Sequence, residues 1–214
     1  MNDPLLNIKG VRCAAVNAGI KNNDDLDLSV ISLVEGSETA AVFTQNVFCA
    51  APVFVAKNHL QNIPRALLIN SGNANAGTGE KGLENTIKAC EILANELNIK
   101  TEHIIPFSTG VIGQQLDLSN FESGIPRAVS QLSDSAINDV SKGILTTDLV
   151  EKNHSISFEV DGKTVSLTGI AKGSGMIRPD MATMLSFIFT DIGASQQELQ
   201  DCLSLSVNQS FNRI

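Results

Sequence analysis

An Asp-Gly pair in the second half of the chain is flanked on both sides by residues that alternate between apolar and polar. The alternating apolar residues are Ile156, Phe158, Val160, Val165 and Leu167. A period of two is that of a β-strand, and Asp161-Gly162 readily adopts the positive φ angles of a type I′ turn. The sequence therefore predicts a β-hairpin, which requires a fold that contains an antiparallel strand pair.

A helical period is found earlier in the chain. Apolar residues recur there at steps of four, three, four and three, at Leu83, Ile87, Cys90, Ala94 and Leu97. This spacing places them on one stripe of a helix. A second helix is predicted near the end of the chain, where Ser195 and Glu198 form a capping box. Its apolar residues are Leu199, Cys202, Leu203 and Val207.

Two shorter helices are predicted between these two. Pro126 can begin one of them at its first turn, with Val129 and Leu132 on the inner face. Ser133 can cap the next helix, which continues through Ile137 and Val140.

Short segments rich in Val, Ile, Leu and Phe predict buried strands. They are residues 26–34, 40–43, 52–56 and 65–70, and a further apolar strand follows Thr183. Strands and helices thus interleave, but the hairpin and the short turns do not fit a simple repeat of strand, helix and strand. We expect an α/β fold in which β-sheet is layered with helices, built as one domain over residues 1–214.

The charge balance excludes one class of partner. The chain has 15 Lys and Arg against 23 Asp and Glu, a net charge of −8. A protein that neutralises phosphates needs clustered basic residues, so we expect no nucleic acid partner. No apolar run approaches the roughly 20 residues that span a bilayer, and residues 1–4 do not resemble the start of a secretory signal. We therefore expect no membrane association and a cytoplasmic location.

The cysteines and histidines are scattered along the chain. They are Cys13, Cys49, Cys90 and Cys202, and His59, His103 and His154. The absence of a C-x-x-C pair argues against a disulfide framework and against a zinc site. We interpret the cysteines as buried thiols and expect no bound metal.

Four segments have an unusual local composition, namely residues 70–77, 108–113, 143–148 and 169–184. The first is rich in Gly and Asn, which favours a tight connection from a strand to a helix over a loop that shapes a site. The third holds two hydroxyls and a carboxylate, and a solvated helix end is the favoured interpretation. The fourth is rich in Gly, but its spacing is not that of a nucleotide-binding loop.

The second of these segments places a hydroxyl beside a glycine amide. Thr109 and Gly110 together can donate two hydrogen bonds to a developing oxyanion. Taken alone, six residues of this kind are more often a turn at the end of a strand.

Thr183 stands at the start of the last apolar strand, directly after Ala182. If its hydroxyl attacked the Ala182 carbonyl, hydrolysis of the ester so formed would leave Thr183 with a free α-amino group. An amine with a reference pKa of about 7.7 to 8.0 is a suitable base for the adjacent hydroxyl. The alternative, which composition alone favours, is an ordinary β-branched strand residue.

Taken together, the motifs resemble those of the ornithine acetyltransferase (glutamate N-acetyltransferase) family of arginine biosynthesis. They occur in the family's order and with compatible spacing at Phe43-Thr44-Gln45-Asn46, Ala50-Ala51-Pro52-Val53, 70–76, 108–113, Thr146-Thr147-Asp148 and 172–187. The resemblance runs from about Gly10 to the last residue. Because the family continues well beyond residue 214, it also implies a domain that is incomplete at its C-terminus.

The resemblance implies the family's layered sandwich and a precursor that cuts itself between Ala182 and Thr183. The products would be an α chain, residues 1–182, and a β chain whose start is residues 183–214. Thr183 would take acetyl from N-acetylornithine, form an acetyl-threonine intermediate and pass the acetyl group to glutamate. The resemblance assigns the oxyanion hole to Thr109 and Gly110, and substrate contact to Thr146, Lys172 and Thr183.

Lys172 suits this role because both substrates carry a carboxylate, for which an ammonium is a simple partner. The resemblance also implies a heterotetramer of α and β chains and no cofactor, although some members accept acetyl-CoA as acetyl donor. Two alternatives stay open. A Thr-nucleophile amidase or aminopeptidase would pass the acyl group to water, and a truncated fragment would be non-catalytic.

Overall fold

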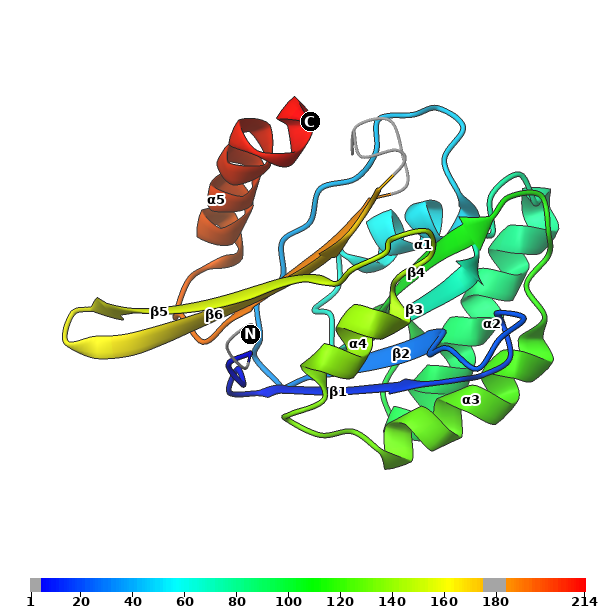
Figure 1. The fold of residues 1–214 in the computed structure, drawn as a ribbon, viewed down its shortest axis with the longest axis horizontal. Coiled ribbons are helices and arrows are strands. Elements are labelled where there is room, and N and C mark those ends of the chain that lie inside the picture. Colours follow the sequence, from blue (N-terminus) through cyan, green and yellow to red (C-terminus); the bar gives the residue numbers. More distant parts are fainter. Residues whose placement is uncertain (1–4, 175–183) are drawn as a thin grey trace.

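A computed structural model of the chain describes residues 5–174 and 184–214. In these ranges the strands form two sheets, one ordered β1–β2–β3–β4 and one ordered β5–β6–β7 (Figure 1). The strands are β1 (Val11–Val16), β2 (Leu28–Leu33), β3 (Ala66–Asn73), β4 (Ile104–Val111), β5 (Lys152–Val160), β6 (Lys163–Lys172) and β7 (Leu185–Thr190). The helices are α1 (Ala51–His59), α2 (Gly79–Leu97), α3 (Leu118–Ser130), α4 (Ile137–Gly143) and α5 (Gln196–Gln209), with the short 3-10 helices η1 (Thr101–His103) and η2 (Phe211–Arg213).

The four-stranded sheet combines antiparallel and parallel pairing. Strands β1, β2 and β3 are antiparallel neighbours, whereas β3 and β4 are parallel. A parallel pair needs a crossover connection, and α2 lies in it. As a result the C-terminal ends of β3 and β4 lie side by side, with Asn70 opposite Ser108 and Gly72 opposite Gly110.

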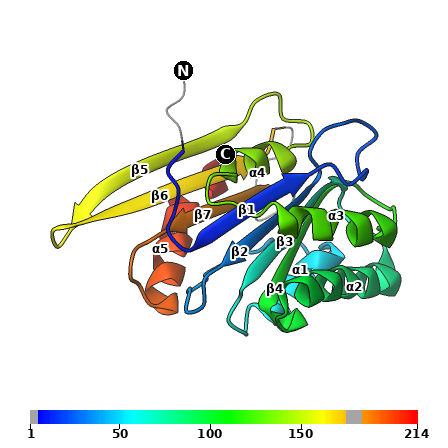
Figure 2. The same cartoon turned by 90° about the horizontal axis from the view of Figure 1, so that it is seen from below.

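The four-stranded sheet is buried on both faces. Helices α2 and α3 cover one face, and α4 with the three-stranded sheet covers the other (Figure 2). Successive residues of a strand face opposite sides of a sheet. Leu68 and Ile104 therefore pack in the core beneath α2 and α3, whereas Ile69 and Ile105 pack in the core beneath α4 and the three-stranded sheet. Burial on both faces explains why these strands are continuous apolar runs. The predicted layered α/β fold is confirmed.

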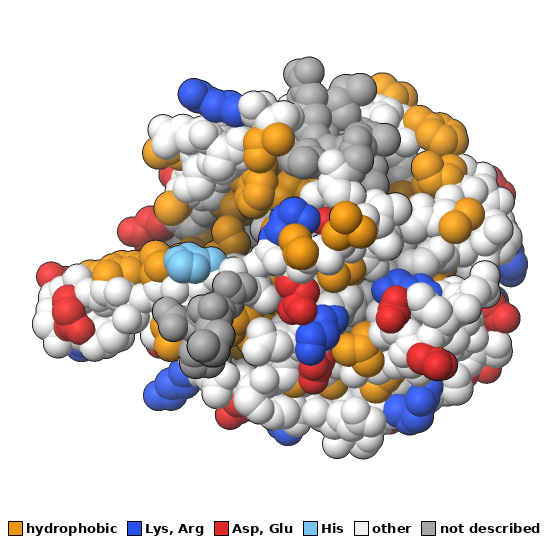
Figure 3. Space-filling model, in the orientation of Figure 1, with side chains coloured by type: hydrophobic (Ala, Val, Ile, Leu, Met, Phe, Trp, Pro, Cys, Tyr) orange, Lys and Arg blue, Asp and Glu red, His pale blue; other side chains and the backbone are white. Residues whose placement is uncertain are grey.

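The β-hairpin is confirmed with its turn. Strands β5 and β6 pair antiparallel from Lys152 opposite Ala171 to Val160 opposite Lys163. Asp161 and Gly162 have φ angles of 50° and 72°, the positive values that a type I′ turn needs. The hairpin extends away from the body of the protein, with apolar side chains along it (Figure 3).

Helix α2 is confirmed, but its buried face is rotated from the predicted stripe. Cys90 and Ala94 are buried, whereas Leu83 and Ile87 are partly exposed. Polar side chains take inner positions here, because Thr86 bonds to Asn75 before the helix and Asn85 bonds to residues 115–116 after β4. At α5 the capping box is confirmed, since Ser195 accepts the N–H of Glu198 and Glu198 accepts the N–H of Ser195.

Two of the predicted strands are wrong, and strand β1 was not predicted. Residues 52–56 belong to α1, which has Pro52 in its first turn, and a short apolar run does not distinguish a buried helix from a strand. Residues 40–43 are in neither a helix nor a strand. Strand β1 lacks a clear pattern because Arg12 and two alanines interrupt its apolar residues.

The two short helices begin at other residues than predicted. Pro126 lies inside α3, which begins behind Asp117, whose carboxylate accepts the N–H of Ser119. Helix α4 has Ala136 at its N-cap, because Ser133 pairs its backbone with Cys13 instead.

The interpretation of the cysteines as buried thiols is confirmed for two of them. Cys13 and Cys90 are buried, but Cys49 is half-buried and Cys202 on α5 is exposed. In the described ranges, no helix combines the length and the hydropathy that crossing a bilayer requires.

Candidate functional site

Lys172, the last residue of β6, is at the centre of a cluster of polar side chains. The residue is only 2% exposed. Its Nζ donates one hydrogen bond to Thr109 Oγ1 on β4 and another to Thr146 Oγ1, 3.2 Å away in the segment after α4. The fold thus brings together three residues that the family resemblance assigned to the oxyanion hole and to substrate contact.

Gly110 follows Thr109 in a conformation that suits glycine. Its φ is 136°, and the pairing of β3 with β4 becomes irregular at Gly72 and Asn73. A Cβ atom at position 110 would lie 2.3 Å from the carbonyl carbon of Gly72 and 2.6 Å from the nitrogen of Asn73. Gly110 therefore permits the close approach of the two backbones beside Thr109.

We expect Gly110→Ala to lower the free energy of unfolding by about 2–5 kcal/mol. The strained φ costs about 1–3 kcal/mol, and forcing the strands apart adds about 1–3 kcal/mol. Urea denaturation measures the loss. Gly113→Ala is the control, because Gly113 also has a positive φ, 83°, but a Cβ there meets nothing within 4 Å. Equal losses in the two variants would contradict the tight packing at Gly110.

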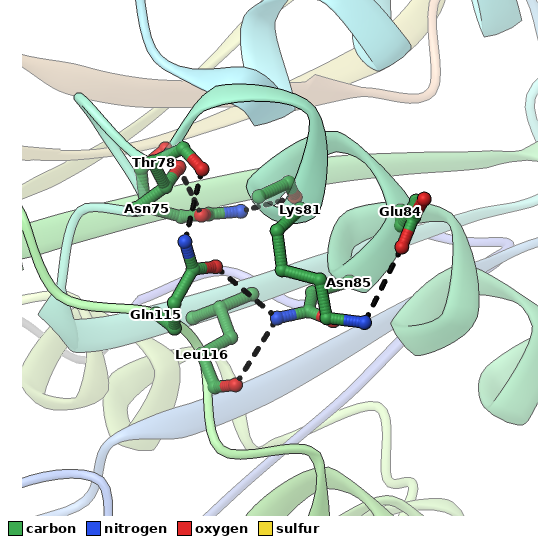
Figure 4. Close-up of polar contacts among 8 residues, drawn as sticks. Asn75, Thr78, Lys81, Glu84, Asn85, Gln115 and Leu116 are labelled. Carbon is green, nitrogen blue, oxygen red and sulfur yellow. Dashed lines mark hydrogen bonds and ion pairs between the residues drawn. The ribbon is translucent and has the colours of Figure 1, made fainter.

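A buried polar network fixes the segment between β3 and α2. Asn75 has a φ of 45°, and its Nδ2 donates to Gly82 O and Thr86 Oγ1 at 2.9 and 2.8 Å. Thr78 donates to Asn75 Oδ1, and Gln115 donates to the Thr78 carbonyl, both drawn in Figure 4. Of the segment 70–77 that was predicted to be a tight connection, residues 70–73 continue β3 and residues 74–77 form the connection to α2.

Asp148 is a buried carboxylate next to Lys172. The interpretation of residues 143–148 as a solvated helix end is therefore wrong for Asp148. The Asp148 side chain is 1% exposed. Its Oδ1 accepts from Lys152 Nζ at 2.6 Å and from the Gly173 N–H at 2.8 Å. Burial acts to raise the pKa of Asp148, but the two hydrogen bonds together with the positive charges of Lys152 and Lys172 hold the pKa below its ordinary value. The carboxylate therefore carries a negative charge at neutral pH.

The surroundings of Lys172 lower the pKa of its ammonium group. Burial lowers the pKa of Lys172 to about 8, the nearby charge of Asp148 acts to raise it, and that of Lys21 acts to lower it. The Lys21 side chain passes close to Gly72, at the end of β3. Lys172 is therefore about half protonated near pH 8, and it loses its charge as the pH rises through that value.

The predicted nucleophile Thr183 and its partner Ala182 are outside the described residues. Strand β7 begins at Leu185, which pairs with Lys172 across the three-stranded sheet. Leu185 is two residues after Thr183 in the sequence. Sequence reasoning missed the burial of Asp148 beside Gly173, although its position in the Thr146-Thr147-Asp148 motif was a signal that it belongs to this cluster.

Comparison with known sequences gives matches over nearly the whole chain. A sequence profile described as the ArgJ family matches residues 12–214. The arginine biosynthesis bifunctional proteins ArgJ of Methylococcus capsulatus and Pseudomonas syringae pv. tomato are 46% and 45% identical over 98% and 97% of this chain. These alignments cover 52% and 51% of the relatives. The chain thus spans about half the length of the curated relatives it matches.

Comparison with solved structures agrees. The crystal structure of the arginine biosynthesis bifunctional protein ArgJ from Bacillus halodurans is 34% identical with a TM-score of 0.75, covering 82% of this chain and 92% of that chain. Ornithine acetyltransferase from Mycobacterium tuberculosis, complexed with ornithine, is 29% identical with a TM-score of 0.72, covering 83% and 94%. The PH0078 protein of Pyrococcus horikoshii, 12% identical with a TM-score of 0.54, shares the fold alone.

Proposed function

The chain belongs to the ArgJ family, and from this membership and the site we propose that it transfers acetyl from N-acetylornithine to glutamate. The nucleophile is Thr183, made available by self-cleavage after Ala182. The observation that carries the proposal is the convergence of Thr109, Thr146 and Lys172 opposite the start of β7. The two hydroxyls bond to the ammonium of Lys172, whose strand partner Leu185 follows the proposed nucleophile by two positions in the sequence.

Self-cleavage supplies both the nucleophile and its base. The Thr183 hydroxyl attacks the Ala182 carbonyl carbon, the peptide C–N bond breaks, and the acyl group moves to the Thr183 oxygen. Water then hydrolyses this ester, which leaves a carboxylate on Ala182 and a free α-amino group on Thr183. That amine is close enough to take the proton from its own hydroxyl in each later attack.

The coverage of the solved relatives supports such a cut. The Bacillus and Mycobacterium chains are covered over 92% and 94% of their length, whereas the first curated relative is covered over 52%. The solved chains are therefore about half as long as the curated proteins. Separate chains produced by one cut near the middle of the polypeptide would have this length.

Acetyl transfer then follows in two half-reactions. The Thr183 oxygen attacks the acetyl carbonyl of N-acetylornithine, and the oxyanion accepts hydrogen bonds from the Thr109 hydroxyl and the Gly110 N–H. The C–N bond breaks, ornithine leaves with a proton, and acetyl-Thr183 remains. The amine of glutamate attacks this ester and regenerates the hydroxyl. In this proposal Thr146 and Lys172 contact the substrate, and the complex of the Mycobacterium relative with ornithine supports ornithine as the kind of ligand bound.

An assay with and without glutamate tests the proposal. Purified protein is incubated with N-acetylornithine alone or together with glutamate, and ornithine and N-acetylglutamate are measured. We expect ornithine to accumulate only with glutamate, at a rate equal to that of N-acetylglutamate. Equal release of ornithine in both samples would instead identify an amidase. A third sample with acetyl-CoA in place of N-acetylornithine tests the second donor.

The proposed assembly is a heterotetramer of two α and two β chains. Size-exclusion chromatography with light scattering measures its mass. We expect the two chains to elute together, and separate elution would contradict the assembly.

A further inference from the structure

We propose that Asp148 is a positioning residue that acts through Lys172, so that the Thr109 hydroxyl points its proton at the reacting oxyanion. This inference rests on the proposed function of Thr109 as an oxyanion donor. Asp148 carries no role in that function. It lies in the segment after α4, and its carboxylate joins this segment to the end of β6.

The first observation concerns the two oxygens of the buried Asp148 carboxylate. Oδ1 receives the hydrogen bonds from Lys152 and Gly173, but Oδ2 is buried and has no hydrogen-bond partner in the described ranges. The ion pair with Lys152 compensates Oδ1, but a buried carboxylate oxygen that receives no hydrogen bond still carries a cost of removal from water. Asp148 is therefore a poor choice for stability alone at this position.

The second observation is what Asp148 holds in place. Its bond from the Gly173 N–H fixes the residue that directly follows Lys172. Burial and the positive charge of Lys21 lower the pKa of Lys172. The negative charge of Asp148 acts in the opposite direction and raises it. Lys152, a further charged group near this site, is itself paired with Asp148. Asp148 thus keeps the Lys172 ammonium both in position and protonated.

The third observation concerns the direction of the hydrogen bonds. An ammonium has three donors and no acceptor, so Thr109 and Thr146 must both accept from Lys172. A threonine hydroxyl has one proton, and in Thr109 this proton cannot point at Lys172. If Lys172 lost its charge, its neutral amine could accept that proton, and the oxyanion would lose a donor. The charge of Lys172 therefore determines the direction of the Thr109 donor.

Asp148→Asn tests the proposal because it keeps the shape and an oxygen for the Gly173 N–H but removes the charge. We expect the pKa of Lys172 to fall by about one unit. NMR titration of protein labelled with 13C-lysine measures it, and a Lys172→Met sample assigns the signal. The control is Asp139→Asn, which neutralises an exposed carboxylate paired with Lys142. It should leave the Lys172 titration unchanged.

The transfer rate should show the same shift. The ammonium form is the competent one, so the Lys172 contribution is present below its pKa and is lost as the pH rises through it. In the Asp148→Asn protein, the fall of kcat at alkaline pH is expected at a lower pH than in the wild type. The displacement should equal the change in the Lys172 pKa that the NMR titration measures. Asp148→Glu restores the charge and is expected to restore most of both values. A folded Asp148→Asn protein with the wild-type Lys172 pKa would overturn the proposal.

A double-mutant cycle tests whether Asp148 acts through Thr109. We expect Asp148→Asn to lower kcat by about fivefold at pH 8, less than the loss of the donor itself. In a Thr109→Val background the same substitution should have almost no further effect on kcat. If the double variant instead lost kcat by the product of the two single losses, the two residues would act independently and the proposal would be overturned. Failure of the proposed function is a separate result, because wild-type protein would then transfer no acetyl while the Lys172 titration would still respond to Asp148.

Discussion

Thr183→Ala is expected to leave the polypeptide uncut and to abolish acetyl transfer. The substitution removes the oxygen that attacks the Ala182 carbonyl, and without the cut the α-amino base never forms. Loss of a covalent nucleophile lowers kcat by on the order of a millionfold in a well-studied protease. Mass spectrometry of the purified protein detects the cut, and the assay with N-acetylornithine and glutamate detects transfer.

Two further variants make this result specific. Thr183→Ser retains a hydroxyl and should still cut and transfer, at reduced rates. Thr190→Ala removes a hydroxyl at the other end of β7, where Thr190 Oγ1 donates to the Ser166 carbonyl, and should cut normally. A cut between positions 182 and 183 in the Thr183→Ala protein would show that another group breaks the bond.

Local pattern was sufficient for the elements that form from neighbouring residues. The hairpin depends on the alternation of apolar and polar residues in its two strands and on the positive φ angles that Asp161-Gly162 adopts. Both features lie within one short segment of the chain. The capping box at Ser195 and Glu198 is likewise local. These features are predictable because distant parts of the chain do not alter their hydrogen bonds.

The errors arise where distant parts of the chain decide the structure. Residues 52–56 would satisfy a strand or a helix, and α1 forms because it packs beside β4, where His59 Nδ1 lies 2.7 Å from the Ile104 carbonyl oxygen. Strand β1 has a weak pattern but completes the edge of the sheet beside β2. In both cases a partner far away in sequence supplies the deciding contacts.

The candidate site shows the same division. The family resemblance identified Thr109, Thr146 and Lys172, but their spacing of up to 63 positions conveys nothing about contact. The burial of Asp148 was not predicted because adjacent hydroxyls and a carboxylate after a helix are usually solvated. Only the packing of this segment against the end of β6 places the carboxylate next to the Gly173 N–H.

Thr109→Val should lower kcat for acetyl transfer by about a hundredfold to a thousandfold, which corresponds to about 2.7–4 kcal/mol of transition-state stabilisation. Valine has nearly the shape of threonine but no hydroxyl, so the oxyanion keeps only the Gly110 N–H. Steady-state kinetics with varied N-acetylornithine separates kcat from KM. An unchanged kcat would remove Thr109 from the mechanism.

A comparison with Thr146 distinguishes loss of the donor from damage to Lys172. Both threonines accept a hydrogen bond from the same ammonium, so Thr109→Val and Thr146→Val each leave Lys172 with one partner fewer. If loss of that partner were the cause, the two variants would lose kcat equally. If the Thr109 proton stabilises the oxyanion, only Thr109→Val loses kcat to this extent, whereas Thr146→Val chiefly raises KM. Thr109→Ser, which restores a hydroxyl, should recover most of the rate.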